Sequence, residues 1–207
     1  MKRLYLLRHG QTEFNVKKLV QGRCDSPLTD LGHQQARAAA AWLKAHGVVP
    51  DKVVSSPLGR AMDTARLVAC ELLGPDAAVE PCEGIIERSY GTFEEGSHDA
   101  LPTDVWDPGE DLVPFGGEGS HALQERMVAT LTNLMSAKGK TLLAVSHGSA
   151  SRQFIKAAAP EGFELPTKLP NCAIMIFDFE ESAPQAEGEP LQCKFTLQQI
   201  VDPQQSN

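Results

Sequence analysis

Short apolar runs alternate along the chain with segments of helical periodicity. Residues 4–7 form such a run between polar neighbours, which predicts a buried strand. Residues 53–54 predict a second short strand, and residues 141–145 predict the clearest strand of the chain. Further strands are expected at 78–82, 173–179 and 193–200. Strands are therefore predicted along nearly the whole length of the chain.

Helical segments separate these strands. The first follows Thr29, a favourable N-cap residue, and ends at Gly47. The second is expected to begin at Ser56 and Pro57 and to end at Gly74. Two more helices are expected at 123–139 and 150–158. This alternation predicts an α/β fold of three layers, αβα, with a mainly parallel central sheet.

The periodic pattern is lost from 97 to 119, where proline and glycine recur. Long irregular segments inside a compact domain are usually lids or binding loops. We therefore expect one domain, residues 1–207, with a small cap at about 92–120 over the carboxyl ends of the strands. Trp106 and Phe115 are expected to pack under this cap. Residues 183–190 are expected to form a loop, and the tail after Asp202 is expected to be mobile.

The chain is acidic, with a net charge of −8 over 207 residues. Proteins that bind nucleic acids or anionic membranes show a basic face, so neither partner is expected. Five scattered cysteines without a Cys-x-x-Cys motif indicate neither a disulfide framework nor a zinc site. No apolar stretch has the length of a signal peptide or a membrane span. We expect a cytoplasmic protein, and the sequence leaves room for a homodimer.

Candidate chemistry lies where two of the strands end. Arg8, His9 and Gly10 come directly after the first strand, and His147 and Gly148 directly after the strand at 141–145. In open α/β sheets, ligands bind just outside the carboxyl ends of the strands. Arginine offers several donors to an anion, histidine can be a nucleophile or a base, and glycine lets the backbone approach a ligand.

Arg60 and Glu87 are expected at the same edge of the sheet. Arg60 lies in the first turn of a helix, where a cation is unfavourable unless an anion is shared with the helix end. Two guanidinium groups beside the imidazoles would repel a metal ion, whereas this cationic group suits a phosphate dianion. His9 would then attack phosphorus, and Glu87 would protonate the leaving oxygen.

The stretch 8–15, Arg-His-Gly-Gln-Thr-Glu-Phe-Asn, resembles the phosphohistidine signature of the histidine phosphatase superfamily, in its phosphoglycerate mutase-like branch. The resemblance covers nearly the whole chain, and the combination of motifs is highly specific. The other matching motifs are Gln21-Gly22, Ser-Pro-Leu-Thr at 26–29, Ser-Pro-Leu-Gly-Arg-Ala at 56–61, Glu87 with Gly91, Gly117-Glu118 and Val-Ser-His-Gly at 145–148.

The resemblance implies that His9 is phosphorylated on Nε2. It implies that the phosphoryl group is held by Arg8, Arg60 and His147, with assistance from Asn15, Gln21 and Gly22. Glu87 is implied as the proton donor and later as the base that activates water. The remaining residues assigned to substrate binding are Gly10, Arg88, Tyr90 and Gly148. No metal ion and no cofactor are expected, and the partner is a small phosphorylated metabolite.

The predicted function is metal-independent hydrolysis of phosphate monoesters. Two alternatives stay open: a phosphoglycerate mutase, and a non-catalytic protein that binds phosphorylated ligands on the same fold. Residues 87–91 resemble the mutases, whereas charge favours a phosphatase. The segment 89–125 contains no Lys or Arg but many carboxylates, so we expect it to repel a second anion. Only Arg23 and Arg88 are expected to offset that charge.

A cysteine phosphatase is a further rival, because Cys82 and Arg88 have its Cys-x5-Arg spacing. Such a loop would turn Glu83 and Glu87 toward a phosphate, which disfavours this reading. Four histidines outside the predicted site are expected at the surface, and among them the cap residue His98 is the strongest candidate for another role. These four are His33, His46, His98 and His121.

Overall fold

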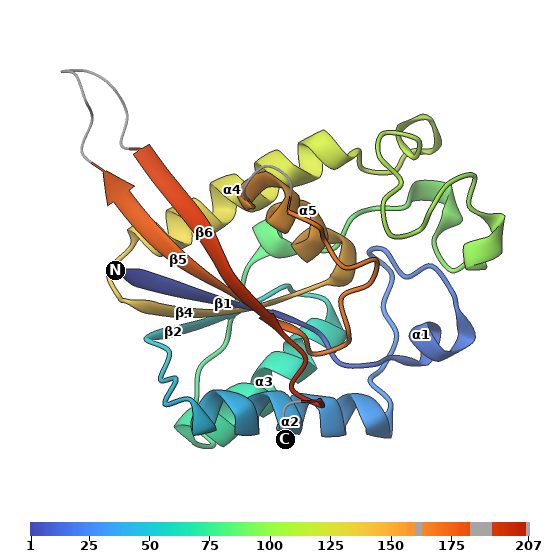
Figure 1. Cartoon of the computed structure of the whole chain (residues 1–207). Helices are drawn as coiled ribbons and strands as arrows, with labels where there is room; N and C mark the ends of the chain where they lie inside the picture. The colour runs from blue at the N-terminus through green and yellow to red at the C-terminus, as the bar shows by residue number, and fades with distance from the viewer. Residues whose placement is uncertain (160–162, 183–191, 206–207) are drawn as a thin grey trace.

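A mixed sheet lies between two layers of helices (Figure 1). The computed structural model describes residues 1–159, 163–182 and 192–205. In these residues the sheet has six strands in the order β3-β2-β4-β1-β5-β6. The strands are β1 (Lys2–Arg8), β2 (Lys52–Ser55), β3 (Glu80–Pro81), β4 (Thr141–Ser146), β5 (Ile174–Ser182) and β6 (Gln192–Val201). The predicted α/β class is confirmed.

Parallel pairing brings the carboxyl ends of three strands to one edge. Strands β1, β2 and β4 run parallel, with Arg8 paired to Ser146 and Ser55 to Val145. Strand β5 is antiparallel to β1 and to β6. The residues that follow β1, β2 and β4 therefore emerge side by side, as the sequence predicted for a mainly parallel sheet.

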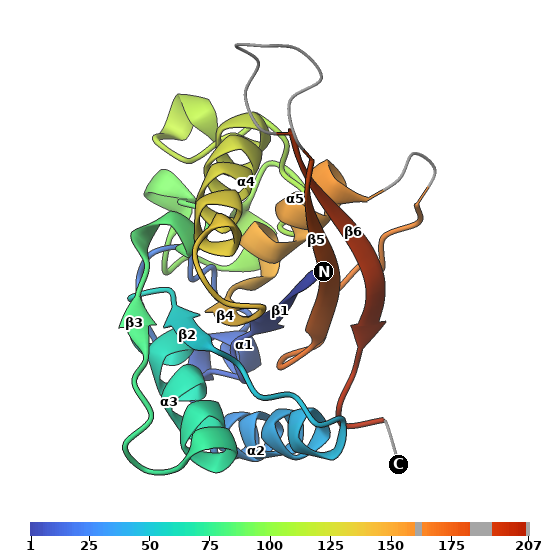
Figure 2. The same ribbon diagram turned by 90° about the vertical axis from the view of Figure 1, so that its left-hand side faces the viewer.

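Helices cover both faces of the sheet. Figure 2 shows α2 and α3 on one face and α4 and α5 on the other, whereas α1 lies near the carboxyl edge. The helices are α1 (Glu13–Lys17), α2 (Asp30–Ala45), α3 (Gly59–Leu73), α4 (Ser120–Ser136) and α5 (Gly148–Ala158). None of these helices is long and apolar enough to span a membrane.

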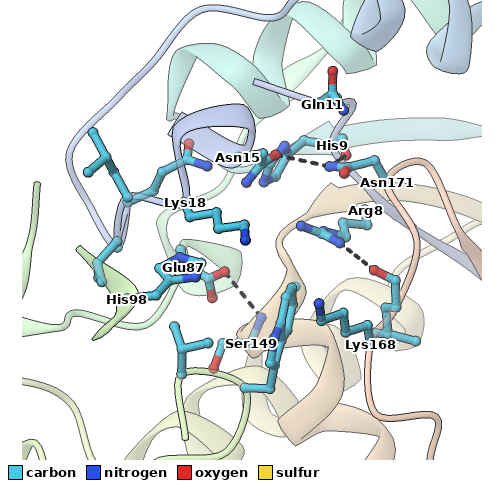
Figure 3. A pocket seen from close by; sticks show the side chains of 18 of the residues that line it. Arg8, His9, Gln11, Asn15, Lys18, Glu87, His98, Ser149, Lys168 and Asn171 are labelled. Carbon is cyan, nitrogen blue, oxygen red and sulfur yellow. Dashed lines mark hydrogen bonds between the residues drawn. The ribbon is translucent and has the colours of Figure 1, made fainter. Parts of the chain in front are cut away.

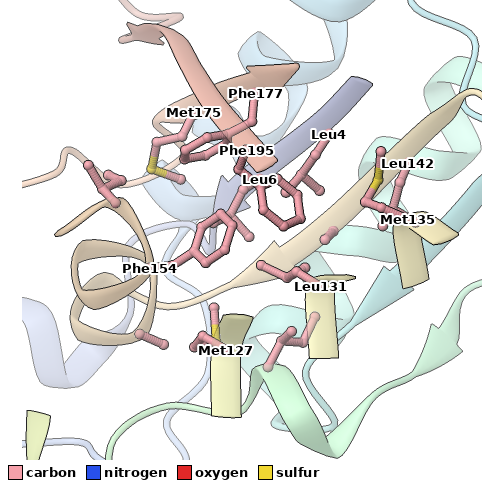
Figure 4. Packing of buried hydrophobic residues seen from close by; sticks show 14 of the residues in the cluster. Leu4, Leu6, Met127, Leu131, Met135, Leu142, Phe154, Met175, Phe177 and Phe195 are labelled. Atoms are coloured by element: carbon pink, nitrogen blue, oxygen red, sulfur yellow. The ribbon is translucent and has the colours of Figure 1, made fainter. Parts of the chain in front are cut away.

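Strand β1 contributes to both layers of the core. Its Leu4 and Leu6 pack with α4 and α5, where Phe154 is fully buried (Figure 4). Tyr5 and Leu7 pack on the opposite side, against α2 and α3. This division follows from the strand geometry, in which successive side chains point to opposite faces. Full burial of a side chain of this size contributes roughly 1.5–3 kcal/mol, so both layers hold β1 firmly in place.

The two helices beside the site begin in different ways. Thr29 caps α2 by accepting a hydrogen bond from the Gly32 N–H (3.0 Å), as predicted. Helix α3 begins at Gly59, so its predicted start at Ser56 was wrong. The cap of α3 comes from a distant loop, because Asp25 accepts from the Gly59 N–H at 2.6 Å. Ser56 instead uses its hydroxyl group to bind His147.

The segment 92–120 lies beyond the carboxyl edge of the sheet, in green in Figure 1. Its regular structure is limited to short 3₁₀ turns, including η3 (His98–Ala100) and η4 (Val113–Phe115), which agrees with the lost periodicity. A small cluster of Val20, Tyr90 and Leu112 joins it to the main body. Phe115 meets Phe93 edge to face but is 42% exposed, so it is only partly packed.

The tail after Asp202 was expected to be mobile, but it forms a hydrogen-bonded turn as far as Gln205. Gln204 donates to the Asn171 carbonyl (3.2 Å) and accepts from Gln35 (3.1 Å). The tail therefore packs beside the loop before β5. The predicted loop at 183–190 lies outside the described residues.

Candidate active site

His9 follows β1 and is almost completely buried, with 3% of its surface exposed. Its Nδ1 lies 2.7 Å from the Gly10 carbonyl oxygen. Because a carbonyl only accepts, Nδ1 carries the proton and Nε2 keeps a free lone pair. Burial, followed by the nearby Arg60 and Arg8, lowers the pKa of His9 far below its ordinary value. His9 is therefore neutral at neutral pH, with the lone pair of Nε2 available.

Three buried nitrogens beside His9 have no hydrogen-bond partner within the described protein. They are Nε of Arg8, Nε of Arg60 and Nδ1 of His147. Buried polar groups in folded proteins are nearly always hydrogen-bonded, so a group of unpaired donors at one place points to a ligand. Arginine donors of this kind suit the oxygens of a phosphoryl group.

Backbone carbonyls fix the outer nitrogens of both arginines. Arg60 donates to the carbonyls of Cys24 (2.8 Å) and Gly22 (2.7 Å) and to Asp25 (3.2 Å). Arg8 donates through Nη1 to the Leu169 carbonyl. Burial lowers the pKa of Arg8 to about 10, so the group is still a cation at neutral pH. These contacts hold each guanidinium group while its Nε is left for a ligand.

His147 lies directly behind His9, with 5.2 Å between the ring centroids. Its Nε2 is 2.7 Å from the Ser56 hydroxyl oxygen, while its Nδ1 has no described partner. Burial, then Arg60, lowers the pKa of His147 far below its ordinary value. A neutral His147 that accepts from Ser56 carries its proton on Nδ1, which makes this nitrogen a donor. Sequence reasoning placed Ser56 at the start of a helix and gave it no part in the site.

The Glu87 carboxylate lies at the N-terminus of α5. Its Oε1 accepts from the N–H groups of Arg88 and Ala150 (both 2.8 Å), and its Oε2 accepts from the Ser149 N–H (3.2 Å). These three hydrogen bonds fix the position of the Glu87 carboxyl group in the wall of the same cavity as His9.

These groups surround a cavity of about 470 Å³ (Figure 3), a size that suits a small metabolite. Most of the predicted site residues line it, whereas His147 lies behind His9, and Gly10 and Arg88 are outside the lining. The predicted residues in the lining are Arg8, His9, Asn15, Gln21, Gly22, Arg60, Glu87, Tyr90 and Gly148.

Arg88, which was predicted to contact the substrate, lies outside the cavity lining and binds other parts of the protein. Its fully buried guanidinium group donates to Ser149 and Ser120 and to the carbonyls of Gly109 and Glu118, at 2.7–3.1 Å. All these partners belong to α4, α5 or the cap, so Arg88 joins the three together. Gly10, which was also predicted to bind substrate, packs against α2. A Cβ at this position would lie 2.5 Å from the Gly32 carbonyl oxygen.

The structure adds two lysines at the cavity that the sequence did not reveal: Lys18, which follows α1, and Lys168, which precedes β5. Trp106 and His98, both singled out in the sequence, line the cavity from the cap. The prediction that only Arg23 and Arg88 could offset the charge of the cap was therefore wrong. Lys18 stands one helical turn after Asn15 of the signature, which was a usable signal. Nothing in the sequence pointed to Lys168.

Trp106, which was predicted to pack under the cap, also lines the cavity. Its ring lies 5.4 Å from the Arg8 guanidinium carbon and 5.7 Å from the Lys168 ammonium nitrogen. Cys82 packs instead against the hydrophobic cluster under α4 and is absent from the cavity lining. With Arg88 committed to the cap, the cysteine phosphatase reading has no support in the structure.

No group of three His, Cys, Asp or Glu side chains within the described ranges is arranged to hold a metal ion. The model of the histidine phosphatase superfamily (branch 1) matches residues 4–189. The chain belongs to the histidine phosphatase superfamily. The predicted family is thereby confirmed, and members of this superfamily are enzymes.

Relatives of this histidine phosphatase carry both mutase and phosphatase names. A protein of Enterobacter named "Probable phosphoglycerate mutase GpmB" is 33% identical over 199 residues, which cover 91% of this chain and 90% of the relative. The solved phosphoserine phosphatase mutant of Entamoeba histolytica in complex with phosphoserine is 28% identical, with a TM-score of 0.73 and coverage of 99% and 98%.

A mycobacterial glucosyl-3-phosphoglycerate phosphatase has the same fold, with a TM-score of 0.76 at 24% identity and coverage of 96% and 98%. Neighbours in the histidine phosphatase superfamily therefore bind small phosphorylated ligands, including phosphoserine. The cradle of Arg8, Arg60 and His147 around His9 is suited to the phosphoryl group of such a ligand.

Proposed function

We propose that this protein is a phosphatase that hydrolyses phosphate monoesters through a phosphohistidine at His9, without a metal ion. One observation carries the proposal. The unprotonated Nε2 of His9 lies beside buried donors of Arg8, Arg60 and His147 that have no partner within the described protein. Such fixed donors stabilise the charge that develops on the phosphoryl oxygens during transfer.

In the first step, the lone pair of His9 Nε2 attacks phosphorus. The N–P bond forms as the P–O ester bond breaks, and the leaving oxygen takes a proton from the Glu87 carboxyl group. To act as the acid, Glu87 must hold a proton, which it takes from solvent or from a substrate monoanion. Activated leaving groups, which need no proton, are expected to depend least on Glu87.

In the second step, a water molecule attacks the phosphohistidine. The Glu87 carboxylate accepts a proton from this water while the N–P bond breaks and its electron pair returns to Nε2. Inorganic phosphate then leaves, and Glu87 is again ready to act as the acid. A phosphoglycerate mutase is the second candidate, because relatives with 33% identity carry that name. A mutase would have to keep water away from the phosphohistidine, and phosphate release distinguishes the two.

The test is turnover of p-nitrophenyl phosphate, a generic monoester with an activated leaving group. We expect phosphate release from the wild type, loss of at least 10³-fold in His9→Ala, and an acid-labile, base-stable phospho-adduct after rapid quenching. His121→Ala is the control, because the His121 side chain is 78% exposed. An adduct on another residue, or turnover by His9→Ala, would contradict the proposal.

A further inference from the structure

Two lysines at the cavity mouth have no acidic partner among the described residues. Lys18 and Lys168 both line the cavity, and neither forms an ion pair there. Other lysines of the chain do form such pairs, namely Lys2, Lys17, Lys52 and Lys156. The two unpaired ammonium groups therefore stand out as candidates for binding an anion from outside the protein.

Both lysines are attached to parts of the site that are themselves fixed. The Lys18 backbone is left-handed (φ 54°), and its carbonyl accepts from the His98 N–H of the cap at 3.1 Å. The Lys168 ammonium nitrogen lies 5.7 Å from the centre of the Trp106 ring, against which Arg8 also packs. Burial lowers the pKa of His98, and the charges of Lys168 and Lys18 contribute to that shift.

Most cap carboxylates that could neutralise these lysines are bound elsewhere. Asp107 pairs with Lys156. Glu118 pairs with Arg126 at 2.8 Å. Glu94 accepts a hydrogen bond from the Cys24 N–H at 3.0 Å. Among the described cap residues, Asp99 is the one carboxylate in the cavity lining, so the cap contributes little negative charge to the cavity wall.

The alcohol part of a substrate must lie near these lysines. In-line transfer to His9 Nε2 places the leaving oxygen on the far side of phosphorus, toward the acid Glu87. Figure 3 shows Lys18 and Lys168 on opposite sides of the cavity, with both ammonium groups turned inward. The wall around the leaving group therefore carries two cations beyond those that hold the phosphoryl group.

The charges in the cavity lining indicate how much negative charge a substrate can carry. The cations are Arg8, Arg60, Lys18 and Lys168, and the carboxylates are Glu87 and Asp99. When Glu87 holds the proton that it donates, three positive charges are in excess. A phosphoryl dianion balances two of these positive charges. The one that is left is balanced by a single carboxylate, whereas a second phosphate dianion would exceed it.

We propose that Lys18 and Lys168 bind one carboxylate on the leaving alcohol, so that the preferred substrates are phosphate monoesters of hydroxy acids. This inference rests on the proposed phosphatase function and adds a substrate class to it. The lysines are specificity-determining residues that act on the leaving group, whereas the phosphoryl group is bound by the arginines.

The test compares 3-phosphoglycerate with glycerol 3-phosphate, which differ by a carboxylate in place of a hydroxymethyl group. We expect wild-type phosphate release to favour 3-phosphoglycerate at least tenfold in kcat/KM. Lys18→Met and Lys168→Met should each lower this ratio about fivefold, as expected for exposed charge contacts, and the double variant should abolish it. Lys17→Met is the matched control, since Lys17 pairs with Glu13 and lies outside the cavity lining.

The outcomes separate the two proposals. Failure of the wild type to hydrolyse p-nitrophenyl phosphate would overturn the phosphatase function itself. Hydrolysis of that ester without a preference for 3-phosphoglycerate, or with a preference that survives in the double variant, would overturn the lysine subsite alone. A lysine-dependent preference for fructose 1,6-bisphosphate over fructose 6-phosphate, stronger than that for the hydroxy acid, would contradict the assignment of a carboxylate.

Discussion

A single hydroxyl group orients His147. The Ser56 oxygen lies 2.7 Å from Nε2. When the Ser56 hydroxyl group donates to Nε2, the imidazole proton is on Nδ1, which can then donate to a phosphoryl oxygen. Ser56→Ala removes that constraint, and we expect kcat/KM to fall about tenfold, equivalent to about 1.4 kcal/mol of a lost hydrogen bond. Steady-state kinetics with p-nitrophenyl phosphate measures the effect.

Ser55→Ala is the matched control for this prediction. The Ser55 hydroxyl group is equally buried but donates to the Ser56 carbonyl (2.9 Å) and does not contact the imidazole. We expect its kcat/KM to stay within a factor of two of the wild type. Equal losses in both variants would show that this segment contributes packing alone.

The two neutral histidines make stability depend on pH. The pKa values of His9 and His147 lie far below 6.5 in the folded protein because of burial and the nearby Arg60. In the unfolded chain they return to about 6.5, so below that pH the unfolded state binds more protons. Stability from this source is therefore present above about pH 6.5 and lost as the pH falls below it.

Urea unfolding without phosphate at pH 7.5 and pH 5.5 tests this prediction. We expect a lower midpoint at pH 5.5 and a smaller difference between the two pH values in His147→Gln. A midpoint that is constant or rises on acidification would contradict the neutral state of these histidines. The same shift keeps His9 unprotonated at pH 6, so loss of the nucleophile should not limit activity there.

At the scale of elements, Arg88 is the residue that holds the cap to α4 and α5. Arg88→Lys replaces a planar group of five donors by one ammonium group that cannot reach all these partners. Because buried acceptors would be left unpaired, we expect a loss of about 3 kcal/mol in the free energy of unfolding. Chemical denaturation measures it.

Arg66→Lys is the control, because the Arg66 side chain is 68% exposed and its ion pair with Asp63 is a surface contact. Exposed pairs contribute at most about 1 kcal/mol, so this variant should behave nearly as the wild type. If Arg88→Lys changed KM strongly while stability stayed constant, Arg88 would act on the substrate as the sequence first suggested.

The sequence predicted the strands that carry the site because each is a short buried run that ends in chemically active residues. Arg8, His9 and His147 were found in this way, and parallel pairing brought them together. Ser56 was misjudged as a helix cap because its partner, His147, is distant in sequence. Lys18 and Lys168 were missed, and Trp106 was assigned to packing alone, because all three stand on irregular segments, whose path depends on tertiary contacts that periodicity does not encode.

For the whole molecule, the contrast is between a net charge of −8 and a cationic cavity. In the proposed mechanism, Arg8 and Arg60 supply the positive charge beside the phosphoryl group that Mg²⁺ supplies in many phosphoryl-transfer enzymes. We therefore expect kcat/KM for p-nitrophenyl phosphate to be unchanged by 5 mM EDTA and by added MgCl₂. A large loss with chelator that Mg²⁺ restores would contradict this mechanism.

The position of Trp106 gives the protein its own optical reporter. The chain has two tryptophans, and the other, Trp42, stacks on His46 in α2 with 3.7 Å between ring centroids. In a Trp42→Phe variant, all indole emission would come from Trp106, whose ring lies close to both Arg8 and Lys168. A bound anion that contacts Arg8 and Lys168 would change the surroundings of the indole, and with them the intensity or wavelength of the Trp106 emission. Ligand binding in the cavity could therefore be followed by fluorescence without any turnover.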